Sequence, residues 1–465
     1  MNCGDVRIER DSLGTVEVNS NVYWGAQTQR SIHFFPFGAV MPTAVVHAFG
    51  HLKAACAQVN GDRGRLNPRL AGWIIQAAEE VACGRLDGHF PLRIWQTGSG
   101  TQTNMNVNEV IANRAIELAG GVLGSRDPVH PNDHVNLSQS SNDTFPTAMH
   151  VAVALEIRQR LRPAVEHLIA ALRQKATAFG AIIKTGRTHL QDAVPLSLGQ
   201  EFGAYASQLE QGLDGIDRSM DGVHQLAIGG TAVGTGLNAP RNFGHDVATI
   251  LAERLGLPFR VAEDPFQALA GHEALAGCHG GLTVLAGSLM KIANDIRWLA
   301  SGPRCGLGEL ILPANEPGSS IMPGKVNPTQ CESVTMVAVQ VMGNNTAVQM
   351  AASQGNFQLN VFKPLIAHNL LESIDLLAGS CQAFCDHCIT GLEADEQRIA
   401  DLLERSLMLV TALAPLVGYD RASEIAKHAH DHRLSLREAA LGLGGITADA
   451  FDRCVQPRRM VSPDP

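Results

Sequence analysis

One long segment without a formal charge constrains the fold of this chain more than any other feature. No Asp, Glu, Lys or Arg occurs between Ser333 and Phe362. Amide side chains interrupt the segment, among them Gln340, Asn344, Asn345, Gln349 and Gln354. Because so many amides are costly in a bilayer, the segment is unsuited to span a membrane. A helix without charge on any side is instead one that other helices surround, so we expect a central bundle helix here.

Apolar periodicity elsewhere predicts a mostly α-helical protein. Residues 147–179, 196–223, 280–300 and 328–352 have the spacing of long bundle helices. Strand-like alternation is confined to short pieces such as 6–18. We therefore expect a fold built around a bundle of long helices.

The chain is too long for a single hydrophobic core, so we expect three regions. Residues 1–139 would form a small mixed N-terminal domain and 140–392 a central domain of long helices. Residues 393–465, where the chain becomes more charged, would form a helical C-terminal domain.

Composition narrows the class of protein. The formal net charge is -9, which argues against nucleic-acid binding because that requires clustered Lys and Arg. Only 17% of residues are charged, so part of the surface is expected to be buried against other subunits. Ten cysteines lie mostly in apolar stretches, and residues 1–10 lack the apolar core of a signal peptide. We expect a cytoplasmic protein without a disulfide framework.

A glycine-bearing loop, Gly318 to Pro328, precedes the uncharged segment. Asn327 occupies an expected N-cap position, Pro328 the first helical position and Gln330 the third position of a capping box. Free N–H groups and the positive dipole end lie at such a helix start, directly after Lys325. The loop therefore predicts an anion-binding site.

Three further polar loops lie between the expected helices. Thr97 to Asn104 and Ser138 to Asp143 each precede a helical pattern, the second with Pro146 in its first turn, and both offer hydroxyls beside free N–H groups. Several such loops suit a ligand with more than one carboxylate. Gly186 to Asp192 adds His189, whose imidazole titrates near neutrality, as general acid–base catalysis requires. Chemistry alone does not single out His189 among eighteen histidines.

Two patterns resemble metal sites but favour a structural interpretation. Cys381, Cys385 and Cys388 have the CxxxCxxC spacing of an iron–sulfur motif, yet this spacing is also one stripe of a helix, so we expect buried packing. His428, His430 and His432 follow one another at intervals of two residues, which do not share a helix face, so we expect an exposed helix end. No metal site is expected.

These loops resemble those of the fumarase/aspartase superfamily. Gly318 to Pro328 is similar to its signature loop at every position. Four further segments resemble class II fumarases in particular: Thr97 to Asn108, His130 to His134, Ser140 to Asn142 and Gly186 to Gln191. The resemblance runs from Arg7 to Asp420 and thus covers nearly the whole chain.

The resemblance implies a metal-independent lyase of the tricarboxylic acid cycle that needs no cofactor. Its partners would be fumarate and L-malate, and it would be a homotetramer whose central domain forms the core and whose active sites are each built from three chains. Fumarate would be hydrated reversibly, by anti addition of water through an aci-carboxylate intermediate, with no role for nucleic acid or membranes.

The resemblance also implies roles for particular residues. Ser319 would be the base that removes the C3 proton, with Lys325 stabilising charge, and His189 with Glu332 would act on the water side. The substrate-binding residues would be Ser99, Gly100, Thr101, Ser140, Ser141, Asn142, Thr188, Ser320, Lys325, Val326 and Asn327. A second, peripheral dicarboxylate site would comprise Arg126, His130, Pro131, Asn132 and Asp133.

Two alternatives stay open at this point. An aspartase-type ammonia lyase would share the fold and the serine loop, but aspartases typically carry glutamine where this chain has His189. A catalytically silent helical scaffold is disfavoured because Ser319, Lys325 and Glu332 are all present.

Overall fold

The chain is described from a computed structural model that covers residues 5–463. Residues 1–4 and 464–465, the ends of the predicted N- and C-terminal domains, lie outside the described residues. The chain divides into two compact units. The first unit comprises the chain up to Pro163 together with Leu213–Ala286 and Val339–Ala378, and the second comprises Ala164–Gly212, Gly287–Ala338 and the chain from Gly379 onward. The three-domain division expected from the sequence stays a prediction.

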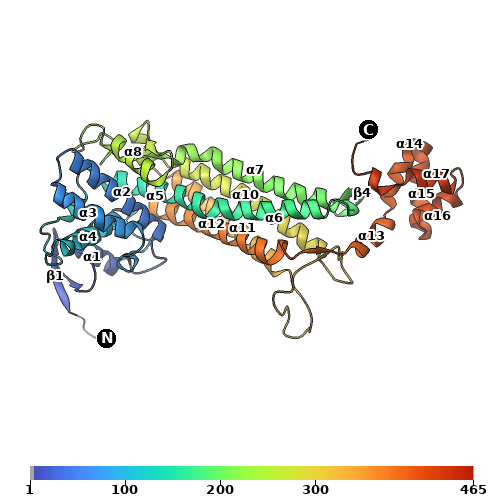
Figure 1. The fold of residues 1–465 in the computed structure, drawn as a ribbon, viewed down its shortest axis with the longest axis horizontal. Coiled ribbons are helices and arrows are strands. Elements are labelled where there is room, and N and C mark those ends of the chain that lie inside the picture. Colours follow the sequence, from blue (N-terminus) through green and yellow to red (C-terminus); the bar gives the residue numbers. More distant parts are fainter. Residues whose placement is uncertain (1–4, 464–465) are drawn as a thin grey trace. The chain divides into compact units, whose positions relative to one another are not determined.

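The first unit is mostly helical, with short strands at its edges (Figure 1). Its helices are α1 (Ala26–Phe34), α2 (Thr43–Asp62), α3 (Pro68–Ala82), α4 (Thr101–Leu118), α5 (Ser141–Glu156), α8 (Phe243–Leu255) and α9 (Pro265–Ala270). Its strands are β1 (Val6–Asp11) and β2 (Gly14–Asn19), which pair antiparallel, and β5 (Gln225–Leu226) and β6 (Arg260–Val261), which pair parallel.

The second unit contains the remaining short helices and strands. Its helices are α6 (Arg162–Ala178, whose first two residues belong to the first unit), α13 (Glu396–Glu404), α14 (Ala414–Val417), α15 (Tyr419–His432), α16 (Leu436–Gly442) and α17 (Ala448–Cys454). Its strands are β3 (Ile183–Thr188) and β4 (Gln191–Ser197), then β7 (Leu310–Ile311) and β8 (Glu393–Ala394), both pairs antiparallel.

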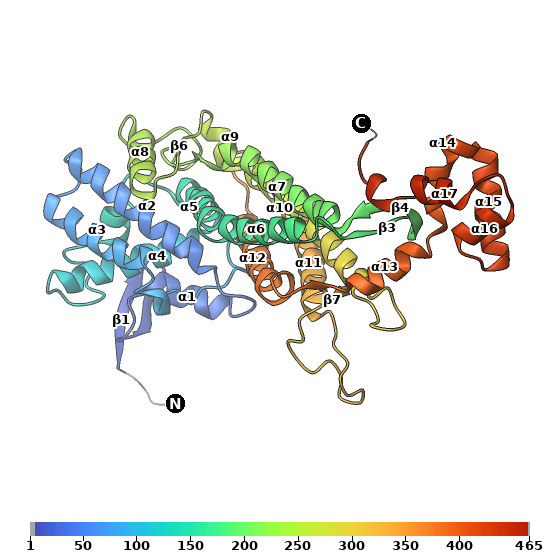
Figure 2. The same cartoon turned by 45° about the vertical axis from the view of Figure 1, so that its right-hand side comes forward.

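Four long helices contribute residues to both units: α7 (Leu198–Val223), α10 (Glu273–Leu299), α11 (Thr329–Ala352) and α12 (Lys363–Phe384). Within each unit their segments run side by side (Figures 1 and 2). Buried polar contacts join them: Asn344 of α11 donates to Ser373 of α12, whose hydroxyl is 2.9 Å from His279 of α10. The predicted mostly helical fold built on long bundle helices is confirmed.

Helix α10 is long and apolar enough to cross a bilayer by length and composition alone. Half of its most apolar stretch is buried inside the protein, including Leu282, Leu285 and Ile292, which have no exposed surface. Core helices of proteins that lie outside membranes meet the same criterion. The packing of α10 against α12 makes it a core helix of this kind.

The cysteine stripe lies where α12 continues into a short π-helical segment, Cys385–Ile389. Cys381 and Cys385 are fully buried and Cys388 is 3% exposed, which confirms the predicted packing role. All nine cysteines among the described residues are free thiols.

Candidate active site

Three predicted hydroxyl side chains form one chain of hydrogen bonds in the first unit. Ser99 Oγ lies 2.8 Å from Thr101 Oγ1, which lies 2.7 Å from Ser141 Oγ. Helix α4 begins at Thr101 and α5 begins at Ser141, so the hydroxyls lie at two helix N-termini. The free N–H groups and positive dipole ends of these helices favour an anion there.

Gly100 separates two of these hydroxyls and must be glycine. Its φ of 78° is left-handed, and a Cβ added to it would lie 2.1 Å from Cδ2 of the buried Phe145. The backbone beside Ser99 and Thr101 is therefore fixed by close packing.

A fully buried carboxylate, Asp143, anchors the second hydroxyl loop. Its Oδ1 accepts from the backbone N–H of Ser140 at 3.0 Å, while Oδ2 accepts from Gly229 at 3.1 Å and Thr231 at 2.9 Å. Ser140 Oγ in turn accepts from Asn142 N, completing a capping box at the start of α5. Burial raises the pKa of Asp143 to about 6, although the three N–H donors lower it. Sequence reasoning placed Asp143 in the cluster but assigned it no role.

A buried lysine that the sequence did not point to supports the same loop. Because α5 begins at Ser141, Pro146 lies in its second turn, not in the first as predicted. Proline has no N–H, so the carbonyl of Asn142 lacks its helical donor and accepts from Lys363 Nζ at 3.3 Å. Burial lowers the pKa of Lys363 to about 7. The Asn142 amide donates to Ala232 O at 2.8 Å.

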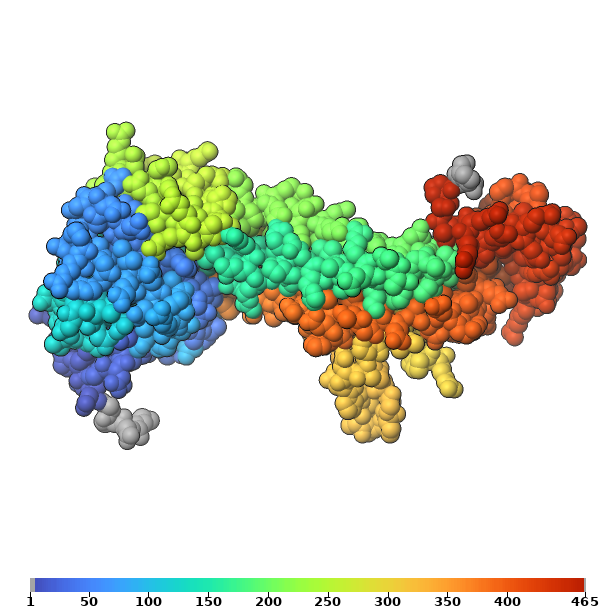
Figure 3. All heavy atoms as spheres, in the orientation of Figure 1, coloured from blue at the N-terminus to red at the C-terminus, as the bar shows by residue number. Residues whose placement is uncertain are grey.

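The loop before α11 belongs to the second unit and is held together by contacts within itself. Ser319 Oγ accepts from the backbone N–H groups of Ile321 at 3.2 Å and Met322 at 3.1 Å. The N–H of Gly318 donates to the carbonyl of Lys325 at 2.9 Å. Ser320, Lys325 and Val326 are exposed, and the segment stands out from the helices of its unit (Figures 2 and 3).

The helix start differs slightly from the prediction. Helix α11 begins at Thr329, so Pro328 precedes the first helical residue, and Gln330 is its second residue. Asn327 therefore lies one residue before the N-cap position, and its Nδ2 donates to the carbonyl of Gly318 at 2.6 Å. The amide thus closes the loop that precedes the helix.

Thr188 and His189 lie at the tip of a β-hairpin that the sequence analysis did not predict. Strands β3 and β4 pair from Ile183↔Ser197 to Thr188↔Gln191, and the two turn residues His189 and Leu190 both have positive φ, 55° and 60°. Two-residue turns of this kind match the twist of the strands but usually contain Asn or Gly. Both turn side chains are exposed.

Buried charges fix the base of this hairpin. Lys184, 1% exposed, lies 3.3 Å from Glu309 and 3.2 Å from Glu201. Glu309 has no exposed surface and also accepts from Arg187 Nη2 at 2.6 Å. Burial raises the pKa of Glu201, while Lys184 lowers it. Paired charges are needed here because an unpaired buried charge would be very costly.

The predicted residues thus gather in three groups. Hydrogen bonds join Ser99, Thr101 and Ser141 directly, and the loop before α11 holds Ser319 beside Lys325 and Asn327. His189 and Glu332 are exposed on different elements, and within the described residues of one chain no hydrogen bond joins them.

Four residues of the predicted second dicarboxylate site, His130 to Asp133, lie together at the start of a short π-helical segment, Pro131–Val135. His130 Nδ1 accepts from the N–H groups of Asn132 at 3.2 Å and Asp133 at 3.1 Å. Partial burial lowers the pKa of His130. The guanidinium of Arg126 donates to the carbonyl of Arg10.

Comparison with known proteins assigns the family. Residues 14–343 match the family model described as Lyase, and residues 409–462 match the model described as Fumarase C C-terminus. The chain is 62% identical to fumarate hydratase class II of Thermosynechococcus vestitus over 458 residues, which cover 98% of each chain. It is 58% identical to fumarate hydratase class II 2 of Bradyrhizobium diazoefficiens, covering 98% of this chain and 97% of that one.

The fold is similar to that of a solved enzyme. The crystal structure of a class II fumarase from Schistosoma mansoni superposes with a TM-score of 0.96 at 47% identity, covering 98% of this chain and 99% of the other. The resemblance found in the loops is therefore confirmed along the whole chain. This chain belongs to the class II fumarate hydratases of the fumarase/aspartase family of lyases.

Proposed function

We propose that this enzyme hydrates fumarate reversibly to L-malate, with Ser319 as the base that removes the C3 proton of malate. The observation that carries the proposal is the position of Ser319 Oγ, which faces two backbone N–H groups within its own loop. Removing a proton next to a carboxylate produces an aci-carboxylate with extra negative charge, and a free serine is far too weak a base for that step. Donors that favour a serine alkoxide reduce this difficulty.

The same loop would stabilise the charge that develops on the substrate. Lys325 would face the carboxylate on which negative charge accumulates, and Asn327, Val326 and Ser320 would complete that end of the site. Because Ser320, Lys325 and Val326 are exposed in the single chain, they are free to close over a bound dicarboxylate.

The hydroxyl chain would bind the dicarboxylate. Ser99, Thr101 and Ser141 offer hydroxyls at two helix starts, where Ser140 and Asn142 add a capping side chain and an amide. Gly100 permits close approach of the backbone to the ligand. Hydrogen-bond donors that are already in place on two helix starts orient a dianion with little rearrangement of the protein.

His189 would act on the water or the departing hydroxide, with Thr188 beside it and Glu332 as its carboxylate partner. Both His189 and Glu332 are exposed in one chain, so we propose that the pair forms between subunits, in an active site shared by three chains. No metal or cofactor enters this scheme.

A homotetramer is supported by the exposed face of α11. Met336, Val339 and Met350 are 68%, 61% and 64% exposed, on a helix whose last charged residue is Glu332. An apolar, uncharged stripe of this kind is suited to packing against copies of itself. We place the enzyme in the cytoplasm and the tricarboxylic acid cycle, although a mitochondrial fumarate hydratase of Rhizopus oryzae is also 57% identical.

The second group, Arg126 and His130 to Asp133, is proposed as a peripheral dicarboxylate site. In the single chain, the two N–H groups that could face an anion donate to His130. Binding there would require the His130 ring to move or to take up a proton.

A spectrophotometric assay tests the proposed reaction. The protein, treated with a chelator, is offered L-malate in one cell and L-aspartate in another, and the ultraviolet absorbance of fumarate is followed. We expect fumarate from malate only. Fumarate from aspartate would identify an ammonia lyase, and no fumarate from either would favour a silent scaffold.

A further inference from the structure

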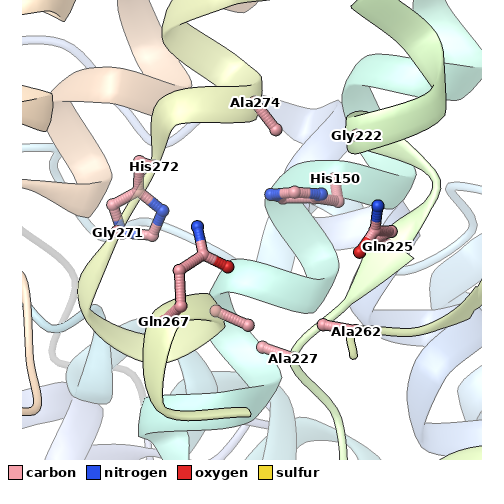
Figure 4. A pocket seen from close by; sticks show the side chains of 10 residues that line it. His150, Gly222, Gln225, Ala227, Ala262, Gln267, Gly271, His272 and Ala274 are labelled. Carbon is pink, nitrogen blue, oxygen red and sulfur yellow. The ribbon is translucent and has the colours of Figure 1, made fainter. Parts of the chain in front are cut away.

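A cavity of about 130 Å³ in the first unit is lined by none of the residues assigned to the reaction. Its polar lining consists of His150, His272, Gln225 and Gln267, and the rest is four alanines and two glycines. Figure 4 shows both imidazoles and the Gln267 amide directed into one space. Gln267 is exposed, so the cavity can be reached from solvent. It is several times larger than the space that one water needs, and it can hold a small molecule.

His272 is the unusual residue of this cavity. Its side chain is 1% exposed, and neither ring nitrogen has a hydrogen-bond partner among the described residues. His150, by contrast, has its Nδ1 2.9 Å from the carbonyl of Val223. Buried polar groups normally have partners, so the two unused nitrogens of His272 indicate a ligand.

The surroundings of His272 favour a negatively charged ligand. Helix α10 begins at the next residue and runs for 27 residues, so its free N–H groups and positive dipole end lie beside the ring. Burial first, and then the neighbouring Lys363 and His150, hold the pKa of His272 well below its usual range. No acidic residue lines the cavity, and the carboxylate of Glu273 accepts instead from Gln267 Nε2 at 2.7 Å.

The rest of the lining limits the kind of anion. The methyl groups of Ala227, Ala262, Ala268 and Ala274 supply the apolar part of the lining, which lies beside four polar side chains. A phosphate or a dicarboxylate would place charged oxygens against some of these methyl groups, which is costly. A carboxylate with a short aliphatic chain satisfies both parts of the lining.

We propose that this cavity binds a small monocarboxylate, with its carboxylate held by His272 and the first turn of α10 and its chain against the alanines. Binding is accompanied by uptake of a proton on His272, because a carboxylate beside the buried ring favours its charged form. The groups that act on this titration are His150 of α5 and Lys363 of α12, with Glu273 of α10 beside the cavity and His224 acting on His150.

Propionate is the probe that tests the site. The full-length protein is kept in excess L-malate, so that malate and fumarate occupy the catalytic site, and propionate is titrated by calorimetry. Propionamide tests whether the ligand must be charged. Inorganic phosphate tests whether the ligand needs an apolar part that contacts the alanine methyl groups. Repeating the titration in buffers with different ionisation enthalpies counts the protons, and we expect net proton uptake on binding.

Two variants locate the binding. Ala268→Met fills the cavity and His272→Leu removes the nitrogens, so each is expected to weaken propionate binding at least about tenfold. Ala270→Met, on the same helix α9 but outside the lining, is the matched control and should bind as the parent protein does. If His272→Leu does not fold, Ala268→Met decides.

Several results would overturn the proposal. These are the absence of binding heat with the parent protein, unchanged affinity in Ala268→Met, equal affinity for propionamide, and tighter binding of phosphate than of propionate. The first result would mean that water alone fills the cavity.

Discussion

The hydroxyl chain at the starts of α4 and α5 and the loop before α11 both present serines near a helix N-terminus, yet they are built in opposite ways. The hydroxyl chain rests on buried groups, since Asp143 and Lys363 are fully enclosed and Gly100 is fixed against Phe145. The loop around Ser319 rests on its own backbone and is largely exposed.

This difference separates two tasks of the enzyme. A rigid cluster can hold the dicarboxylate with donors already in place, whereas the proposed base, Ser319, lies on a segment that would have to admit the substrate and exclude water. Changes in the first region should therefore affect stability and substrate binding together. Changes in the second should affect the rate of the chemical step and leave stability nearly unchanged.

Replacing the proposed base should give the largest effect. Ser319→Ala removes the proton acceptor, so kcat should fall by a factor on the order of 10²–10⁴. The thermal midpoint should stay the same, because Ser319 bonds only to N–H groups of its own exposed loop. Assays of malate dehydration and thermal unfolding on the same samples measure both quantities.

Ser333→Ala, at an exposed position of α11, is the matched control for that experiment and should change neither quantity. A Ser319→Ala protein that keeps its kcat would remove Ser319 as the base. A large fall in its thermal midpoint would instead show that the loop is structural.

The hairpin of β3 and β4 resembles the hydroxyl chain in that it rests on buried groups, although its tip is exposed. Glu309→Gln leaves Lys184 and Arg187 short of a buried counter-charge, which should cost about 3–5 kcal/mol of stability. The thermal midpoint should fall and kcat should decrease with it, because His189 lies at the tip of this hairpin. Glu316→Gln removes the same charge from an exposed loop position and should be silent. Equal midpoints for the two variants would contradict the role given to the buried charges.

How much of the fold and of the candidate site the sequence predicts depends on how far apart in the sequence the contacting residues are. The hydroxyl loops were found because Ser, Thr and Gly beside a helical pattern are local signals. That Thr101 and Ser141 meet at 2.7 Å was not predictable, since forty residues separate them and tertiary packing alone sets their distance. Glu309 carries no local signal for the hairpin it supports, more than a hundred residues away.

Local rules also failed where tertiary contacts compete with them. The β3–β4 hairpin was missed because His189 and Leu190 replace the Asn-Gly pair that normally marks such a turn. Asn327 looked like an N-cap because its sequence position fits one, but it lies one residue before the N-cap position, and its amide closes the loop to Gly318. The fold class and the signature loop did follow from the sequence, because each rests on many consecutive residues.

Two glycines with the same backbone conformation test the comparison directly. Gly100 and Gly324 have φ values of 78° and 81°, so alanine strains both equally. A Cβ at Gly100 would also meet Phe145 at 2.1 Å, whereas nothing lies within 4 Å of one at Gly324. Gly324→Ala should cost about 1–2 kcal/mol, and Gly100→Ala about 1–3 kcal/mol more. Equal costs, measured by thermal or denaturant unfolding, would show that the hydroxyl chain is no more rigid than the loop.

The smallest expected effect concerns the hydroxyl chain itself. Thr101→Val keeps the size of the side chain but removes the hydroxyl between Ser99 and Ser141, and one hydrogen bond to the dicarboxylate with it. A lost hydrogen bond of about 1.4 kcal/mol corresponds to a tenfold rise in KM, and kcat should change much less, because the bond is present before and during the reaction. Thr97→Val is the matched control, since Thr97 Oγ1 is exposed and lies 3.4 Å from Ser99 Oγ at the weak end of the chain. If Thr101→Val lowers kcat and leaves KM unchanged, the hydroxyl acts in the transition state, and the separation between a binding region and a reacting region fails at Thr101.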